Sequence, residues 1–325
     1  MFFMCVAVLI AGFIALVKGA GIFVDGSAAL ARNFRVPGLI IGLTIVAVGT
    51  SAPELAVSIT AAVQGSNEIA LSNVVGSNIF NLLCVLGMCA LIHPVSSEKA
   101  VLKRDFPLSI GVTALVFLLS CGTFVFSGQI ARAGMDGDAG VVGRGEGILL
   151  ILLIGAYIAY LILDARKHPA PEEDVEKKPL WKCALFIGAG LGLIVAGGQA
   201  VVYGAKEIAG ALGMSETLIG LTIVAVGTSL PELVTSVVAA RKGETGLAVG
   251  NVVGSNLFNL MLILGISAAI HPVAVNVASV YDMGILIFVS LLTFLFLLTA
   301  RTLKRPEGAV MVLMYAAHMV FAVIR

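Results

Sequence analysis

Charged side chains are scarce in this sequence: Asp, Glu, Lys and Arg make up only 12% of its 325 residues, whereas 59% of the residues are hydrophobic. A soluble domain of this size has no room to bury so many apolar side chains, so the composition excludes a soluble globular protein. The apolar residues form long runs and do not alternate with polar ones, which favours helices over a transmembrane β-barrel. We therefore expect an all-α integral membrane protein.

Other chemistry-bearing features are also missing. The sequence has no phosphate loop or nucleotide motif, which counts against a primary pump. Its five cysteines show no paired spacing, so we interpret them as small apolar packing residues rather than metal ligands. His93 and His271 each precede a proline at the end of an apolar run, and we interpret them as helix termini. No cofactor and no nucleic-acid partner is predicted.

Ten apolar runs are each long enough to cross a hydrocarbon layer of about 30 Å as a helix. The first run lacks a basic segment ahead of it and a clear small-residue cleavage site, so we interpret it as a helix of the mature chain rather than a signal peptide. We place the ten spans near residues 1–19, 36–63, 67–93, 106–127, 147–164, 183–203, 215–240, 245–271, 281–300 and 309–324.

One peptide occurs twice in the chain. Residues 42–93 and 220–271 align without a gap at an offset of 178, and 32 of the 52 positions are identical. Such internal similarity indicates a membrane protein built from two related halves. We expect a first five-helix repeat at 1–163 with its core at 36–93, a linker at 164–182, and a second five-helix repeat at 183–325 with its core at 214–271.

The basic residues predict the orientation of these halves. When the 20 Lys and Arg are sorted by loop, sixteen fall on one side of the membrane and four on the other. This asymmetry predicts a multi-pass protein of the cell (inner) membrane with both termini outside and the loop at 164–182 in the cytoplasm. The linker at 64–68 has no Lys or Arg, whereas its counterpart at 241–244 has two. Equivalent loops therefore lie on opposite faces, and we expect the two repeats to be inverted.

Each copy of the repeat places one glutamate, Glu54 or Glu232, inside an otherwise uncharged apolar stretch. Every other acidic residue falls at the edge of an apolar run or in a polar loop. A charged carboxylate near the centre of a bilayer costs about 3 kcal/mol unless something compensates it. No Lys or Arg in the repeat cores is placed to neutralise these two groups, so a bound cation or proton is the natural compensation.

The residues around each glutamate predict a site rich in oxygen. Pro53 and Pro231 remove an amide donor and clash with the preceding turn, so each helix should break there, at the midplane, and expose backbone carbonyls. Pairs of polar residues four positions apart share a helix face. Two-fold related copies would gather eight side chains around one centre: Thr50, Glu54, Ser77, Asn81, Thr228, Glu232, Ser255 and Asn259. Carboxylate, carbonyl, hydroxyl and amide oxygens suit Ca²⁺ or Na⁺.

These motifs resemble those of the calcium/cation antiporter superfamily, and specifically of its sodium/calcium exchanger branch in its compact prokaryotic form. The two alpha repeats of that family carry Gly-Thr-Ser-x-Pro-Glu and Gly-Ser-Asn-x-x-Asn/Asp, and both motifs occur twice here, in register. The resemblance covers the ten-helix layout, although the motifs themselves occupy only the repeat cores. It implies a secondary transporter rather than an enzyme, whose partners are inorganic cations and the lipid bilayer.

The resemblance also implies a set of ligands. Glu54 and Glu232, with backbone oxygens of Thr50 and Thr228, would hold a central Ca²⁺. One flanking Na⁺ site would use Ser51, Ser77 and the carbonyl of Ala47, and the other Ser229, Ser255 and the carbonyl of Ala225. Asn81 and Asn259 would line the middle. Some family members have an aspartate at the second of these positions, so Asn259 removes one titratable group and leaves the coupling ion open.

Three other functions stay open from the residues alone. Two neighbouring carboxylates in a low dielectric titrate as a coupled pair, so a proton-coupled calcium exchanger is the main alternative. A passive cation channel would also use a ring of oxygens, although inverted repeats with broken helices favour alternating access. An intramembrane enzyme could use the carboxylate pair for acid/base chemistry, but it gains nothing from the symmetric Ser, Thr and Asn residues.

Overall fold

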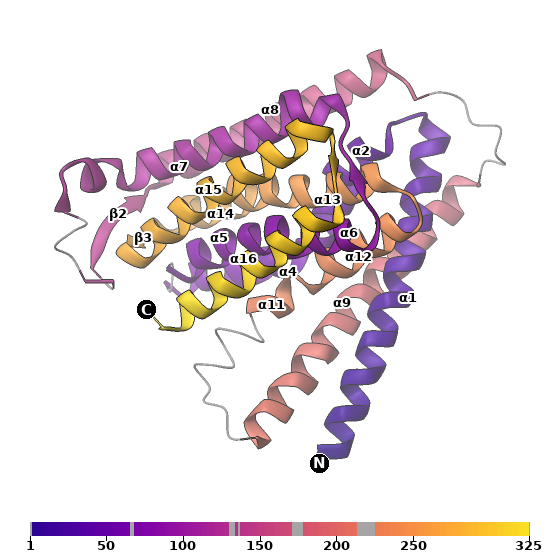
Figure 1. Cartoon of the computed structure of the whole chain (residues 1–325), viewed down its shortest axis with the longest axis horizontal. Coiled ribbons are helices and arrows are strands. Elements are labelled where there is room, and N and C mark those ends of the chain that lie inside the picture. Colours follow the sequence, from indigo (N-terminus) through magenta and orange to yellow (C-terminus); the bar gives the residue numbers. More distant parts are fainter. Residues whose placement is uncertain are drawn as a thin grey trace.

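The computed structural model describes residues 2–65, 68–129, 134–135, 137–170, 178–212 and 225–324, and these residues form a helical bundle (Figure 1). The first half of the chain contains α1 (Phe2–Phe34), α2 (Gly38–Ile41), the π-helix η1 (Gly42–Val46), α3 (Ala47–Thr50), α4 (Ala52–Val63), α5 (Glu68–Phe80), the π-helix η2 (Asn81–Val85), α6 (Leu86–Ile92), the π-helix η3 (Val101–Asp105), α7 (Phe106–Phe126) and α8 (Arg144–Lys167). The second half contains α9 (Leu180–Ala211), α11 (Ala225–Thr228), α12 (Leu230–Arg241), α13 (Thr245–Phe258), the π-helix η6 (Asn259–Ile263), α14 (Leu264–Ile270), α15 (Val277–Ala300) and α16 (Arg305–Ile324).

Many of these elements join end to end into continuous helices that are long enough to span a membrane. Within the described part of the chain, seven helices are long and apolar enough to cross a membrane, and the bent pair formed by residues 38–50 and 52–63 makes eight. The other two predicted spans correspond to α12, which follows residues outside the described ranges, and to α16. The protein is thus an all-helical, multi-span membrane protein, while the count of ten spans stays a prediction.

The first and sixth predicted spans are longer than we expected. We predicted helices near 1–19 and 183–203, whereas α1 has 33 residues and α9 has 32. The two helices lie side by side (Figure 1), and glycines seven residues apart form the seam between them. A Cβ atom on Gly12 would lie 2.9 Å from the carbonyl oxygen of Gly197, and one on Gly19 would lie 2.9 Å from that of Gly190. These pairs show that α1 and α9 run antiparallel, and the close packing extends both helices beyond the predicted ends.

Contacts between the two halves are reciprocal. Gly87 of α6 packs on Gly308 of α16, and the equivalent Gly265 of α14 packs on Gly147 of α8. Two short antiparallel sheets, which the sequence did not predict, follow the same rule: β1 (Val95–Ser96) pairs with β4 (Thr302–Leu303), and β2 (Asp138–Val142) pairs with β3 (Val273–Asn276). Each sheet therefore contains one strand from each half of the chain, as a two-fold relation requires.

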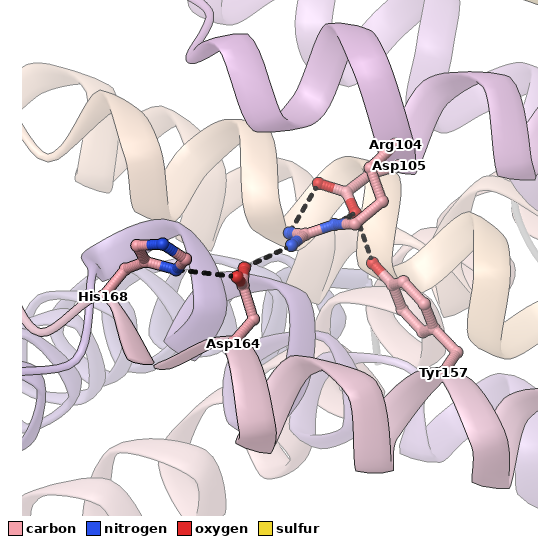
Figure 2. Close-up of polar contacts among 5 residues, drawn as sticks. All are labelled: Arg104, Asp105, Tyr157, Asp164 and His168. Atoms are coloured by element: carbon pink, nitrogen blue, oxygen red, sulfur yellow. Dashed lines mark hydrogen bonds and ion pairs between the residues drawn. The ribbon is translucent and has the colours of Figure 1, made fainter. Parts of the chain in front are cut away.

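One acidic residue besides Glu54 and Glu232 is fully buried, which was not predicted from the sequence. Asp105, at the end of η3, has no exposed surface, and its carboxylate is bound by the guanidinium of Arg104 and by the hydroxyl of Tyr157 at 2.9 Å (Figure 2). Arg104 also donates to Asp164 at 2.6 Å, and Asp164 in turn contacts His168 at 3.1 Å. The sequence missed this cluster because Asp105 stands at the edge of an apolar run, where solvent was expected.

This cluster yields a prediction about stability. Arg104→Gln leaves the buried Asp105 without its charge partner, and breaking one side of a buried ion pair costs about 3–5 kcal/mol. We expect a clearly lower thermal unfolding midpoint in detergent. The adjacent Lys103 is exposed, so Lys103→Gln is the matched control and should leave the midpoint unchanged. Equal midpoints for the two variants would show that the cluster does not stabilise the fold.

Candidate cation site

The helix breaks predicted at the prolines are present in both repeats. In the first repeat α3 ends at Thr50 and α4 begins at Ala52, with a bend of 50° and with Ser51 outside helical geometry at φ −82° and ψ 8°. In the second, Ser229 has φ −93° and ψ 6° between α11 and α12. The break falls at the serine rather than at the proline. The threonine and the glutamate of each repeat thus belong to different helices, and the predicted shared helix face does not exist.

The breaks place the two glutamates at helix N-termini. Glu54 lies in the first turn of α4 and Glu232 in the first turn of α12, and both are fully buried. The positive end of a helix dipole stabilises a carboxylate there, which lowers the cost of burying it. The carbonyl ends of α3 and α11 face the same breaks and offer neutral oxygen ligands. Each break therefore combines a negative side chain with backbone oxygens.

Hydrogen bonds cross between the two repeats at this point. Ser51 donates to Glu232 at 2.9 Å, and Ser229 donates to Glu54 at 2.8 Å. Ser229 also contacts Ser77 Oγ at 3.1 Å. Each serine thus orients the carboxylate of the opposite repeat, so neither repeat forms the site alone. The sequence placed these residues in one region but gave no sign of the crossing.

Four asparagines complete the framework, and sequence reasoning missed them. Asn251 accepts from Thr50 Oγ1 at 2.9 Å and donates to Ser236, while Asn73 donates to the equivalent Ser58 and to the carbonyl of Glu54. Asn78 and Asn256 bind each other's carbonyl oxygens at 3.1 and 3.4 Å. Asn78 and Asn256 stand inside the recognised Gly-Ser-Asn-x-x-Asn motif, and Asn73 and Asn251 lie just before it; all four are identical between the repeats, which was the signal that could have revealed their role.

The two predicted middle residues, Asn81 and Asn259, are held by this framework. Asn81 donates to the side chain of Asn256 at 3.1 Å, and Asn259 donates to that of Asn78 at 3.0 Å. Each is the first residue of a π-helix, η2 or η6, a local distortion that is frequent at functional sites. Because the amide nitrogens are used in the framework, the amide oxygens are left for another partner.

Unpartnered oxygens mark where that partner belongs. Glu54 Oε2, Glu232 Oε2, Asn81 Oδ1 and Asn259 Oδ1 are buried and have no hydrogen-bond partner among the described residues. Ser255 Oγ, on α13, is likewise buried and has no hydrogen-bond partner among the described residues. Buried acceptors that lack a donor are costly, whereas a hard cation is satisfied by oxygen atoms of this kind. Among the described residues no group of three His, Cys, Asp or Glu side chains gathers, so the donor set is dominated by neutral oxygens.

Two of the predicted backbone ligands behave differently. The carbonyl of Ala47 accepts from Ser51 N at 3.0 Å, as in a regular helical turn, and keeps a second lone pair for a cation. In the second repeat Ser229 N donates to Val226 at 3.2 Å. Ala225 begins α11, and the residues just before it, 220–224, lie outside the described chain.

Close packing brings the repeat cores together. Gly250 and Gly254 of α13 press on η1 and α2: a Cβ atom on Gly250 would lie 2.5 Å from the carbonyl oxygen of Leu39, and one on Gly254 would lie 2.8 Å from Cα of Leu43. Small residues at these positions permit the close approach of backbones that is common between membrane helices. The partner expected for the equivalent Gly76, Leu221, lies outside the described residues.

A cavity leads toward the site from one side. It has a volume of about 380 Å³ and lies between α9, α4 and the break at α11. Pro53, Thr228 and Pro231 line it, next to the two buried glutamates, and Gln199, Tyr203 and Lys206 of α9 line its opposite wall. We call it the access cavity. It adjoins the prolines that directly precede the two glutamates in the chain.

Comparison of this chain with known proteins identifies its family. The family described as "Sodium/calcium exchanger protein" matches residues 4–163 and 182–324, which is most of the chain. The chain belongs to the sodium/calcium exchanger family. Its exchanger fold is similar to that of a solved structure of the sodium-calcium exchanger NCX_Mj, with a TM-score of 0.82 at 29% identity over 98% of this chain and 99% of that one.

Relatives of this exchanger-family chain cover its whole length. The sodium/calcium exchanger MaX1 of Methanosarcina acetivorans is 34% identical, and the alignment covers 96% of this chain and 97% of MaX1. The inner membrane protein YrbG of Escherichia coli is 32% identical over 97% of this chain and 94% of YrbG. The family and the prokaryotic type predicted from the motifs are thus confirmed.

Proposed function

We propose that this protein is a secondary active antiporter that exchanges Ca²⁺ for Na⁺ by alternating access. The observation that carries the proposal is the pair of buried glutamates, each bound by a serine of the opposite repeat and each keeping one oxygen without a partner. Such a pair needs a cation, and the names of the relatives MaX1 and NCX_Mj support Na⁺ and Ca²⁺. Two ionised carboxylates balance one Ca²⁺ or two Na⁺.

Exchange follows from shared ligands. In our proposal Glu54 and Glu232 hold a central Ca²⁺ together with the backbone oxygens of Thr50 and Thr228, and Asn81 and Asn259 line the middle. The flanking Na⁺ sites use Ser51, Ser77 and the Ala47 carbonyl on one side, and Ser229, Ser255 and the Ala225 carbonyl on the other. The site cannot hold both kinds of ion at once, yet it must be filled before the protein changes its facing direction. The two ion fluxes are thereby coupled without covalent chemistry.

The architecture we propose has ten transmembrane helices in two inverted five-helix repeats with both termini outside. The antiparallel packing of α1 on α9 supports this inversion, because the two helices occupy equivalent positions in the two halves. The access cavity then opens to the outside, and the linker at 164–182 lies in the cytoplasm. α1 and α9 contribute no side chain to the predicted ligand set, so they are the elements we expect to rock or slide against the repeat cores.

A flux assay tests the function. The purified protein is reconstituted in proteoliposomes, and Ca²⁺ movement is followed under a Na⁺ gradient and, separately, under a pH gradient. We expect the Na⁺ gradient to drive Ca²⁺ against its own gradient and the pH gradient alone to drive none. Movement under the pH gradient alone would indicate proton coupling, and Ca²⁺ that only ran downhill under both conditions would indicate a channel.

A further inference from the structure

The two ends of the α1 and α9 pair are packed differently. α9 is separated from α4 by the access cavity, whereas the equivalent face of α1 packs directly on α12. In a two-fold arrangement the same contact would be made on both sides. We interpret this difference as one facing direction of the transporter, with a gap between α9 and α4, the open side, and none between α1 and α12 among the described residues, the closed side.

Charged side chains join α1 to the turn between α12 and α13 on the closed side. Lys242 donates to the carboxylate of Asp25 at 2.7 Å and to the carbonyl oxygen of Gly21 at 2.9 Å. Arg32, near the end of α1, pairs with Glu244 at 3.4 Å. Lys242 ends α12 and Glu244 precedes α13, so both pairs hold the same short turn. We call these four residues the α1 clamp: Asp25, Arg32, Lys242 and Glu244.

The charges of the clamp are not repeated at the equivalent positions of the other half of the chain. At the offset of 178, Asp25 and Arg32 correspond to Tyr203 and Gly210, and Lys242 and Glu244 correspond to Gln64 and Ser66. None of these four equivalents carries a charge. A state that closed the α9 side would therefore not form the same two ion pairs at these positions.

We propose that the α1 clamp sets the resting direction of the transporter, by favouring the state in which the access cavity is open. This inference rests on the proposed function in one respect, namely that α1 and α9 move between two facing states. The clamp residues touch no predicted ion ligand, so they act on the equilibrium between states and not on the site itself. Exposed pairs of this kind shift an equilibrium by about two- to fivefold each.

Labelling of the access cavity tests the clamp. Val57 lines the cavity and is 39% exposed, so Val57→Cys provides a reporter for a membrane-impermeant maleimide added outside right-side-out vesicles. The natural cysteines are buried or half-buried, and the chain without the reporter gives their background. We expect Lys242→Gln and Asp25→Asn each to slow labelling, at most by the about two- to fivefold change in the equilibrium constant, because the labelling rate follows the fraction of open molecules. The double variant, with Lys242→Gln and Asp25→Asn, should be labelled no more slowly than the slower single variant, because both substitutions remove the same ion pair.

Two further variants make the result specific. Exchanging the charges, Asp25→Lys with Lys242→Asp, should restore most of the labelling rate, whereas Lys304→Gln, an exposed lysine away from α1, should not change it. Unchanged labelling in all clamp variants would overturn the proposal, as would single effects that simply add in the double variant. Labelling needs no ion gradient, so it is measured independently of exchange. If the protein transports Ca²⁺ but the clamp variants label at the parent rate, only the clamp proposal fails. If the clamp variants change the labelling rate but the protein transports no Ca²⁺, only the proposed exchange function fails.

Discussion

Glu54→Gln and Glu232→Gln should each abolish Ca²⁺ transport. Either change removes one of the two negative charges of the site and leaves a neutral amide in its place. Losing one charged partner from a buried pair costs about 3–5 kcal/mol, which corresponds to a Ca²⁺ affinity weaker by more than about 100-fold. Gradient-driven Ca²⁺ uptake in proteoliposomes is the measurement, and Glu207→Gln, on α9 and outside the site, is the control that should keep transport.

Thermal unfolding separates this effect from misfolding. Without Ca²⁺ both variants should unfold at the same temperature as the parent protein or higher, because an unpaired buried charge has been removed. Ca²⁺ should raise the midpoint of the parent protein and not that of the variants, since only a bound ligand stabilises the folded state. A variant that still gained stability from Ca²⁺ and still transported it would exclude the glutamates as ligands.

Gly250→Ala should destabilise the protein although alanine is the better helix former. The added Cβ would lie 2.5 Å from the carbonyl oxygen of Leu39 and 2.9 Å from Cα of Gly42. Both are backbone atoms, so the contact cannot be relieved by rotating a side chain. Forcing an atom into such a contact costs about 1–3 kcal/mol. It would also move η1, which leads into the break at Ser51. We therefore expect a lower unfolding midpoint and weaker transport.

The same substitution elsewhere should have the opposite sign. Gly284 lies on the exposed face of α15, and no atom among the described residues lies within 4 Å of its Cβ position. Gly284→Ala should raise the free energy of unfolding by up to about 1 kcal/mol through helix propensity. If Gly250→Ala were as harmless as Gly284→Ala, the close contact of α13 with α2 and η1 would not be required for the fold.

The sequence was most informative where the repeat concentrates its polar residues. A glutamate in an apolar stretch beside a proline was sufficient to predict a buried carboxylate at a helix break, because both follow from local chemistry. The crossing of Ser51 to Glu232 and of Ser229 to Glu54 could not be predicted, because it depends on how two segments separated by almost 180 positions meet. Asn73 and Asn251 could have been noticed, since both are identical between the repeats and each binds a serine only 15 positions away.

Local context misled the predictions at two other places. Asp105 stands at the edge of an apolar run and its burial was not predicted; the adjacent Arg104 and Tyr157 of α8 allow it to be buried. A glycine can end a helix or serve as a contact within one, and the predicted first span ended at Gly19. In the structure this glycine is a contact with α9, and the helix continues to Phe34. Only tertiary packing distinguishes the two uses of the residue.

Competition between the two ions at equilibrium tests the central claim most directly. Radioactive Ca²⁺ is bound to the purified protein in detergent, and Na⁺ is added at constant ionic strength with choline as the replacement cation. The shared-ligand site predicts one Ca²⁺ per chain, displaced cooperatively by Na⁺, and no such site when both Glu54 and Glu232 are changed to Gln. Ca²⁺ that remained bound at saturating Na⁺, or that bound equally well to the doubly substituted protein, would contradict it.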